Sequence, residues 1–598
     1  MFDINIAFIT LIWELMNHKT EKVGRVSFRP QKPAFSLDES KKTDLPRALP
    51  EEEGVSSADL YAFVKELSED EKAHVHQLMI VRHGKVIFET AFDPYVRGVW
   101  HYAYSMSKSA AVIAVGILLD EGRISLDDRV IDYFPEEWSP VNGIRFSSMT
   151  VKDLLVMSGG SSFNEVGAIS GNDWVKGFFS SSLKFVPGSR FDYNSMNTFM
   201  LSAIVSKCAG MDLFSFLKLR VFSVMGIREV FWESSPTGIT KGGWGLFIKT
   251  EDAVKIGLLF MNKGVYNGVR ILSEEFVNMA TTPQIGTDMP YSPFYGMQIW
   301  MDHREGSFMF NGMLGQDVHC YPDLDMVIAV NGGHDSILQK SRVTDIIRSH
   351  FGDGFKVMAE GTDPAAARGD LAKLAALKER CEGSAQSSMP CTIVKGGWKR
   401  RYMTGAGLLP DPVLFFRNIA GKTYELQEKG IGVMPLMMQV IHNNYTRGIS
   451  LIRFRTLNRT VYMDVLEGPE TFSIPIGFGK GRHASLDFMG ESYLIGTKGR
   501  LSRNEDGRDV LSLRICFIEE ACERLIKLVF EKDGNISLYF NETPGSEMIA
   551  TTLEKIGPGS SGTSPIMNSI MSQISPELVR NAVRTGINPV ARGILREH

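Results

Sequence analysis

The chain has 598 residues, which at roughly 100–200 residues per domain corresponds to two to four domains. Hydrophobic residues make up 43% and charged residues 22% of the chain, a composition typical of a globular protein with a sizeable core. The 65 Lys and Arg residues nearly balance the 69 Asp and Glu residues, so the formal net charge of −4 gives no reason to expect nucleic acid or an anionic membrane as a partner.

The apolar segment Ile4–Met16 lacks the features of an export signal. Asp3 stands where a signal peptide carries Lys or Arg, Glu14 interrupts the run, and no small-x-small cleavage site follows. The segment is also shorter than the roughly 20 residues that cross a bilayer. We therefore expect a docked or amphipathic surface helix, no transmembrane segment and a cytoplasmic location. Residues 1–50 as a whole are predicted to form an N-terminal arm.

Regular patterns begin at Glu51. An N-capped amphipathic helix is predicted over Ala58–Leu67, followed by a hairpin of Gln77–Arg82 and Lys85–Ala91. A strongly apolar helix follows over Ala110–Glu121. Later patterns predict helices Val151–Met157, Thr198–Cys208, Leu213–Val221, Thr250–Met261 and Leu338–His350 and strands Met297–Met301, Asp317–Tyr321 and Met326–Asn331. Strands at both ends of a helical middle predict an α+β domain over 51–355, with a sheet packed against a helical lobe.

The remaining residues change in character twice. A linker is predicted over 356–420, with a helix over 363–380. Residues 421–556 carry many short strand patterns and a Lys-Asp-Gly-Asn turn, which predict an all-β barrel or sandwich. A lipocalin-like barrel of this kind can hold a small ligand or cap a neighbouring domain. The Gly- and Ser-rich stretch near 560 predicts a flexible linker, and a helical tail completes 557–598.

The strongest chemical signal is the spacing of Ser105 and Lys108 directly before the apolar helix. If Ser105 opens that helix, Lys108 lies one turn further on the same face. A serine hydroxyl is a weak nucleophile and needs a base within hydrogen-bond reach, and a desolvated lysine can serve. The same SxxK spacing occurs at Ser181/Lys184 and Ser215/Lys218, but neither pair precedes a long buried helix.

The Ser105 motif is the first of an ordered set of sequence stretches. The set comprises Tyr104–Ser109 (YSMSKS), Gly122–Val130 (GRISLDDRV), Met149–Leu155 (MTVKDLL), Pro187–Ser195 (PGSRFDYNS), Gly264–Ser273 (GVYNGVRILS), Tyr295–Trp300 (YGMQIW) and Gly312–Gln316 (GMLGQ). In order and spacing it resembles the serine β-lactamase-related family, which includes penicillin-binding-protein-like enzymes, carboxylesterases, D-aminopeptidases and nylon-oligomer hydrolases. The resemblance covers residues 51–350 and implies a β-lactamase/transpeptidase-like fold.

The resemblance also implies roles for individual residues. Ser105 would attack a carbonyl, Lys108 would activate it, and Tyr193 would pass the proton to the leaving group. The backbone N–H groups of Ser105 and Met313 would form the oxyanion hole. Contacts to substrate would come from a further set of residues, namely Ser195, Asn194, Asn311, Gly312 and Trp244. No metal or cofactor is implied, and the partner would be a small ester, amide or peptide-like substrate.

Two positions depart from the family pattern. Relatives that bind a substrate carboxylate carry Lys-Thr-Gly or His-x-Gly on the edge strand, where this chain has Phe310-Asn311-Gly312. The usual His-Thr-Ser-Gly loop reads Val156-Met157-Ser158-Gly159. A missing cation argues against an efficient β-lactamase or D,D-peptidase and favours neutral esters or amides.

Two other functions remain open at this stage. The altered edge strand and the additional β domain are also compatible with a catalytically silent sensor or small-ligand-binding protein. Alternatively, the β domain is the functional unit and the N-terminal domain its scaffold. Dispersed histidines without HxxxH or HExxH spacing argue against a metal site.

Overall fold

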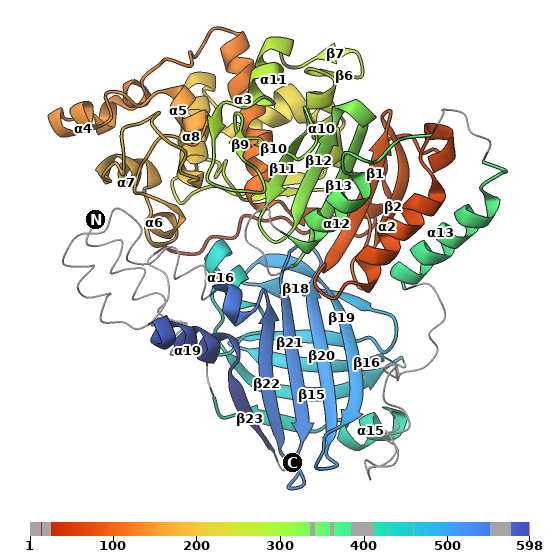
Figure 1. Cartoon of the computed structure of the whole chain (residues 1–598). Coiled ribbons are helices and arrows are strands. Elements are labelled where there is room, and N and C mark those ends of the chain that lie inside the picture. The colour runs from red at the N-terminus through yellow and green to blue at the C-terminus, as the bar shows by residue number, and fades with distance from the viewer. Residues whose placement is uncertain are drawn as a thin grey trace.

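The computed structural model describes Glu14 and residues 26–334, 341–358, 364–383, 412–428, 430–458, 460–549 and 576–596. These residues form an N-terminal α+β domain and a C-terminal barrel, which lie against each other (Figure 1). The predicted fold class is therefore confirmed. Apart from Glu14, the predicted surface helix over Ile4–Met16 lies outside the described residues, and so does the linker near 560.

The N-terminal domain is built on an eight-stranded antiparallel sheet with the order β2-β1-β13-β12-β11-β10-β9-β8. Its strands are β1 Val75–Arg82, β2 Lys85–Ala91, β8 Ile285–Gly286, β9 Phe294–Tyr295, β10 Trp300–Met301, β11 Phe308–Gly312, β12 Gln316–Tyr321 and β13 Met326–Gly332. Every residue of β1 and β13 is buried, because helices cover both faces.

One face of the sheet packs against α2, α12 and α13, and the other packs against α10 and a helical lobe (Figure 1). The first set comprises α2 Ser57–Glu69, α12 Arg342–Phe351 and α13 Arg368–Cys381. The second comprises α3 Ser107–Asp120, α4 Pro140–Arg145, α5 Val151–Leu155, α6 Glu165–Ser170, α7 Trp174–Ser180, α8 Ser195–Ala209, α9 Leu213–Leu217, α10 Thr250–Met261 and α11 Glu274–Ala280. Helix α3 is buried along nearly its whole length, which explains its uniformly apolar sequence.

A small sheet of β3 His101–Tyr102, β5 Leu246–Ile248 and β4 Val230–Trp232 lies beside the N-terminus of α3. A two-stranded ribbon of β6 Val265–Tyr266 and β7 Val269–Arg270 lies at the surface. The small sheet matters for the site because β3 leads directly into the segment that carries Ser105.

One predicted strand is much shorter than its sequence pattern. Met297–Met301 was expected to be extended, but only Trp300–Met301 pairs as β10. Gln298 has a φ of 61°, and its amide donates to Leu154 O and Leu155 O at 3.0 and 2.9 Å. These bonds tie the segment to α5, so Gln298 links the sheet to the helical lobe instead of continuing the strand.

The barrel is a ten-stranded antiparallel sheet with the order β17-β16-β15-β14-β23-β22-β21-β20-β19-β18. Its strands are β14 Thr423–Leu426, β15 Ile449–Leu457, β16 Thr460–Glu467, β17 Glu470–Ile476, β18 Arg482–Phe488, β19 Glu491–Arg503, β20 Asp509–Phe517, β21 Glu523–Phe530, β22 Ile536–Thr543 and β23 Val590–Leu595. Gly499 N donates to Gly477 O at 2.7 Å across the gap between the two ends of the sheet, so the barrel is nearly closed. A Cβ at Gly499 would lie 2.3 Å from Ile476 Cγ2, so glycine permits this approach.

Short helices accompany the barrel, namely α15 Pro412–Ile419, α16 Leu436–His442 and α19 Pro576–Ile587. The C-terminal region differs from the predicted helical tail. After α19 the chain forms β23, which pairs with β14 on one side and β22 on the other. Val590–Leu595 is too short to show a strand pattern reliably, and the two neighbouring strands supply the hydrogen bonds that fix it.

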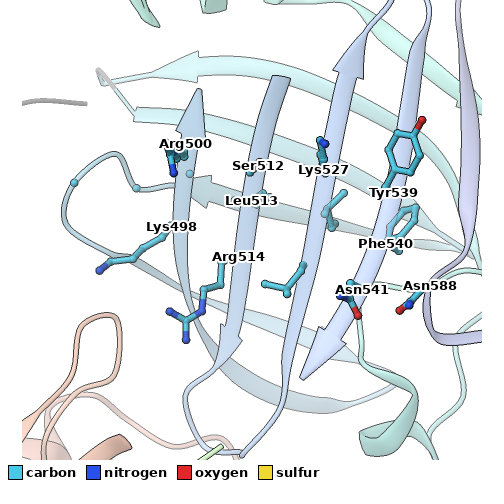
Figure 2. Close-up of a pocket in the computed structure, with 15 residues that line it drawn as sticks. Lys498, Arg500, Ser512, Leu513, Arg514, Lys527, Tyr539, Phe540, Asn541 and Asn588 are labelled. Atoms are coloured by element: carbon cyan, nitrogen blue, oxygen red, sulfur yellow. The ribbon is translucent and has the colours of Figure 1, made fainter. Parts of the chain in front are cut away.

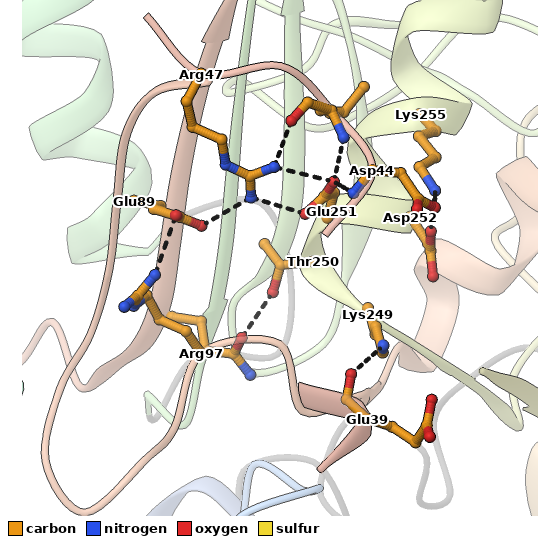
Figure 3. A network of polar contacts seen from close by, with 12 residues as sticks. Glu39, Asp44, Arg47, Glu89, Arg97, Lys249, Thr250, Glu251, Asp252 and Lys255 are labelled. Atoms are coloured by element: carbon orange, nitrogen blue, oxygen red, sulfur yellow. Dashed lines mark hydrogen bonds and ion pairs between the residues drawn. The ribbon is translucent and has the colours of Figure 1, made fainter. Parts of the chain in front are cut away.

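The described part of the arm, residues 26–50, lies along the N-terminal domain and is fastened to the start of α10 (Figure 3). The Glu251 carboxylate accepts from Asp44 N at 2.7 Å and Leu45 N at 2.6 Å, and it pairs with Arg47 at 2.9 Å. Lys255 adds an ion pair to Asp44 at 2.7 Å. The arm is therefore an integral part of the domain surface.

Within the described part of the chain, no single helix has the length and apolar character needed to cross a membrane. The bent pair Ser195–Ala209 and Leu213–Phe222 meets the criterion only when the two helices are taken together.

The arm contacts predict a stability effect for Glu251→Gln. The substitution removes the charge that satisfies two backbone N–H groups and Arg47 at a buried position, so we expect the free energy of unfolding to fall by about 2 kcal/mol. Thermal unfolding measures this loss, and limited proteolysis should cut near residue 45 more rapidly. Lys65→Ala, which breaks the exposed Lys65–Glu69 pair on α2, is the control and should change neither readout. Equal behaviour of the two variants would contradict the prediction.

Candidate active site

Ser105 lies in a one-turn 3-10 helix, Tyr104–Met106, between β3 and α3. Tyr104 has a φ of 47°, a left-handed conformation that costs an L-residue roughly 1–3 kcal/mol. Gly312, the last residue of β11, lies against this turn, because a Cβ there would be only 2.3 Å from Ala103 O. Glycine at position 312 therefore lets β11 and the turn approach each other, and Ser105 itself stays partly exposed.

Lys108 is the centre of the hydrogen bonding at this turn. Its ammonium group is buried and donates to Ser105 Oγ at 2.9 Å, Ser195 Oγ at 2.8 Å and Gly243 O at 2.8 Å. Three acceptors satisfy the three donors of a lysine head group. The first turn of α3, the start of α8 and the loop before β5 thus converge on one nitrogen atom.

The electrostatic surroundings of Lys108 favour its neutral form. Burial lowers the pKa of Lys108 to about 7, and the carboxylate of Glu165 on α6 acts in the opposite direction. Glu165 is fixed near the site by the bond that its Oε1 accepts from Ser195 N at 3.0 Å. A lysine with this pKa exchanges its proton near neutral pH, which is what a general base requires.

Tyr193 covers the other side of Lys108. The Lys108 nitrogen lies 4.9 Å from the centroid of the Tyr193 ring, and that ring stacks on Trp300 at 5.4 Å. Burial raises the pKa of the Tyr193 hydroxyl well above its usual range, although hydrogen bonding to Ser105 works against that rise. Tyr193 is therefore a neutral phenol that can donate a proton or a hydrogen bond beside Ser105.

Sequence reasoning missed two residues of this site. Gly243 supplies the carbonyl that Lys108 contacts, and a Cβ at Gly243 would lie 2.7 Å from Ser195 O. The Gly242-Gly243 pair was the available signal, since consecutive glycines mark close backbone approach. No sequence pattern points to Glu165, which reaches the site only through the tertiary fold.

Comparisons with known proteins found a matching family model and several similar chains. The Beta-lactamase family model matches residues 60–330. This part of the chain belongs to the beta-lactamase family. The 6-aminohexanoate-dimer hydrolase of Paenarthrobacter ureafaciens is 25% identical over 282 residues, which cover 42% of this chain and 70% of that protein. An uncharacterised protein of Mycobacterium tuberculosis is 23% identical over 256 residues, which cover 34% of this chain and 64% of that protein, slightly less than two thirds of its length.

Two solved structures illustrate the range of similar chains. A D-stereospecific amidohydrolase from Streptomyces is 15% identical, with a TM-score of 0.41 over 49% of this chain and 99% of its own. A family VIII carboxylesterase is 14% identical, with a TM-score of 0.40 over 57% of this chain and 100% of its own.

The other residues predicted for the site make contacts within the protein. Trp244 follows Gly243 directly and stacks on Trp174 at 5.3 Å, and Met313 follows Gly312 beside the nucleophile turn. The Asn194 amide caps α8 and donates to Ser161 O and Phe163 O, so its side chain holds a loop. The Asn311 amide donates to Asp317 at 2.5 Å. Substrate contacts by these residues stay predictions.

Phe310 lies on β11, at the position where some relatives carry a cation. The expectation that this is an edge strand is wrong, because β11 pairs with β12 on one side and with β10 on the other. The Phe310 side chain is 2% exposed and packs on Phe260 at 5.6 Å inside the core of the beta-lactamase-family domain. The position therefore contributes to core packing, and it presents no positive charge to a substrate.

The two other SxxK pairs have ordinary structural roles. Ser181 hydrogen-bonds Ser161 at 2.9 Å, and Lys184 forms an ion pair with Asp192 at 3.0 Å. Ser215 donates to Asp212 at the start of α9. Neither pair joins serine to lysine, which distinguishes them from Ser105 and Lys108.

The barrel has a separate surface groove of about 670 Å³ across β19–β22 (Figure 2). Four cationic residues line it, but Lys498 pairs with Asp93 at 2.6 Å and Arg514 pairs with Glu523. With half of its positive charge already neutralised, the groove lacks a concentrated anion site. Among the described residues, no group of three or more His, Cys, Asp and Glu side chains could hold a metal ion.

The geometry at Gly243 predicts a loss of Ser105 reactivity in Gly243→Ala. The added methyl group must push the 243 carbonyl or Ser195 away from Lys108, and displacements of this size cost about 100-fold in rate. The measurement is the rate at which a fluorophosphonate labels Ser105, followed by intact-mass spectrometry. Gly286→Ala, where a Cβ meets nothing within 4 Å, is the control and should label like the wild type. Undiminished labelling of Gly243→Ala would refute this assignment of the carbonyl.

Proposed function

We propose that the protein is a serine hydrolase that cleaves an ester or amide bond through an acyl-enzyme on Ser105. The observation that carries this proposal is the buried Lys108 ammonium group, 2.9 Å from Ser105 Oγ, with its pKa lowered by burial to about 7. A structural lysine gains nothing from a depressed pKa, whereas a base that activates serine needs it. Membership of residues 60–330 in the beta-lactamase family supports the same chemistry.

The proposed proton path uses two residues. Neutral Lys108 keeps two N–H donors for Gly243 O and Ser195 Oγ, and its lone pair faces Ser105. Lys108 takes the Ser105 proton as Oγ bonds to the substrate carbonyl carbon. The leaving group then departs with a proton from Tyr193. Lys108 gives Tyr193 the proton that it took from Ser105. Water hydrolyses the acyl ester by the same steps in reverse and restores Ser105.

The charge of the site supports a neutral scissile group. Phe310 lies in the core, so this position of β11 offers no cation for a substrate carboxylate. Glu165 adds a negative charge near Ser195 and Lys108. These features disfavour penicillin-like anions, and the similarity to a 6-aminohexanoate-dimer hydrolase supports an ester or amide substrate.

Ser105→Ala tests the proposal directly. We expect the wild type to gain one fluorophosphonate adduct at Ser105 and to hydrolyse p-nitrophenyl acyl esters, and we expect the variant to do neither while keeping its melting temperature. Ser215→Ala removes the serine of an unconnected SxxK pair and should retain both properties. Stable acylation of wild type without turnover would favour a silent sensor, and esterase activity in Ser105→Ala would overturn the proposal.

The pKa of Lys108 also predicts the pH dependence. Because the neutral amine is the active form, kcat/KM should rise as the pH passes through about 7 and then level off. Glu165 and Tyr193 face Lys108, and the Tyr193 phenol stays neutral over this range because burial raises its pKa. Lys108→Arg cannot lose its proton below pH 12 and should be inactive at every pH tested. If kcat/KM of Lys108→Arg still rose near pH 7 as in the wild type, Lys108 would be excluded as the base.

A further inference from the structure

The β20–β21 hairpin of the barrel ends beside the segment that carries Ser105. Its connecting residues, 518–522, have exposed fractions of 0%, although turns of hairpins normally face solvent. Glu519 O accepts from Tyr102 N at 2.8 Å, on the edge of β3 opposite to β5. A backbone hydrogen bond therefore joins the barrel hairpin to the strand from which the nucleophile turn emerges.

Side chains from the same hairpin contact the turn itself. The Tyr104 hydroxyl lies 3.9 Å from Cys522 Sγ, and the Tyr104 side chain is 3% exposed. Tyr104 is the residue in the strained left-handed conformation directly before Ser105. Burial of its side chain against the barrel stabilises a backbone conformation that the local sequence disfavours.

A chain of buried charges continues from the hairpin toward Lys108. His442 of α16 lies between Glu520 of the hairpin, at 3.1 Å, and Glu233 of the N-terminal domain, at 2.8 Å. Glu233 also pairs with Lys241 at 2.8 Å and accepts from the Tyr102 hydroxyl at 3.1 Å. Burial opposes a charged imidazole, but the two carboxylates outweigh it and raise the pKa of His442 to about 10.

The contacts of Glu233 with Tyr102 and Lys241 connect it to the candidate site. Tyr102 is three residues before Ser105, and Lys241 is two residues before Gly243, whose carbonyl accepts from Lys108. Lys241 N also bonds to Glu233 O at 3.0 Å, and Gly243 N bonds to Lys241 O at 2.7 Å. Glu233 thus holds the Ser105 segment and the Gly243 segment at a fixed separation.

The arm closes the other side of this interface. Lys32 is 1% exposed at its side chain, pairs with Glu519 at 2.9 Å and donates to Ser492 O at 2.6 Å. Its ammonium group lies 4.5 Å from the centroid of the Tyr493 ring and 5.5 Å from that of Phe247. A buried cation that joins arm, barrel and N-terminal domain leaves the hairpin little freedom to move.

We infer that Glu233 and His442 are positioning residues for the Ser105–Lys108 pair, and that the barrel completes the active site through the 518–522 hairpin. This inference rests on the proposed hydrolase function. It assigns the barrel to the catalytic unit, where its role is to fix the nucleophile turn and the Gly243 carbonyl. Substitutions about the interface should therefore change the chemistry at Ser105 even though none of these side chains contacts it.

The test uses the full chain with Glu233→Gln, His442→Gln and Tyr102→Phe. Lys498→Met is the matched control, because Lys498 and Asp93 form another interdomain ion pair, at 2.6 Å, that has no contact with β3. Fluorophosphonate labelling of Ser105 is measured as a function of pH, with thermal unfolding in parallel. Tyr102→Phe loses one hydroxyl only, so it keeps the test valid if a charge variant fails to fold.

We expect labelling to slow by about tenfold or more in all three variants, relative to Lys498→Met. The rise of the labelling rate near pH 7 should also move to higher pH. A displaced Gly243 carbonyl admits water to Lys108, so the pKa of Lys108 rises. A purely structural role would lower the melting temperature without changing the pH at which the labelling rate rises. If the wild type reacts and the three variants match Lys498→Met in the labelling rate and in its pH dependence, the inference fails and the proposed function stands. If the wild type itself is unreactive, both fail.

Discussion

The structure of the N-terminal domain depends on the satisfaction of one buried ammonium group. Lys108 sits on a helix that is apolar on every side, and a charge or amine there requires oxygen atoms supplied from elsewhere. Ser105 comes from its own turn, Ser195 from α8 and Gly243 from the loop before β5. These segments are far apart in sequence, so their meeting fixes the start of α3, the start of α8 and the loop before β5 relative to one another.

Close backbone approach is the second constraint, and it follows from the first. Gly312 allows β11 to contact the nucleophile turn, and Gly243 allows its loop to contact Ser195. Gln298 departs from its strand and bonds α5 and Thr198 of α8, which ties the lobe to the sheet near the same place. A site built from backbone contacts of this kind tolerates little displacement, because each segment limits the position of the next.

The barrel contributes to this arrangement through one hairpin. Ion pairs that would be weak at the surface are buried here, and two of them cross between parts of the chain: His442 pairs with Glu233 of the N-terminal domain, and Lys32 of the arm pairs with Glu519 of the barrel. Removing one partner leaves an unpaired charge in a dry interface, so the two domains are held in one relative position. The arm is held at both ends of the segment from Lys32 to Arg47, by Glu519 of the barrel and by Glu251 of the N-terminal domain, while most of the residues between them are exposed.

The sequence by itself determined the local features of this protein. The SxxK spacing before an apolar helix, the ordered family motifs and the alternating strands could be read directly, because helix period, strand period and turn residues are local properties. They predicted the α+β domain, the barrel and the Ser105–Lys108 pair. Only the tertiary structure decided that Glu165 and Gly243 join them, that Asn194 and Asn311 bond within the protein, that Val590–Leu595 enters the barrel and that the 518–522 hairpin contacts the segment before Ser105. Those outcomes depend on contacts between residues up to several hundred positions apart. Packing and desolvation set the free energies of these contacts, and such contacts produce no periodic pattern in the sequence.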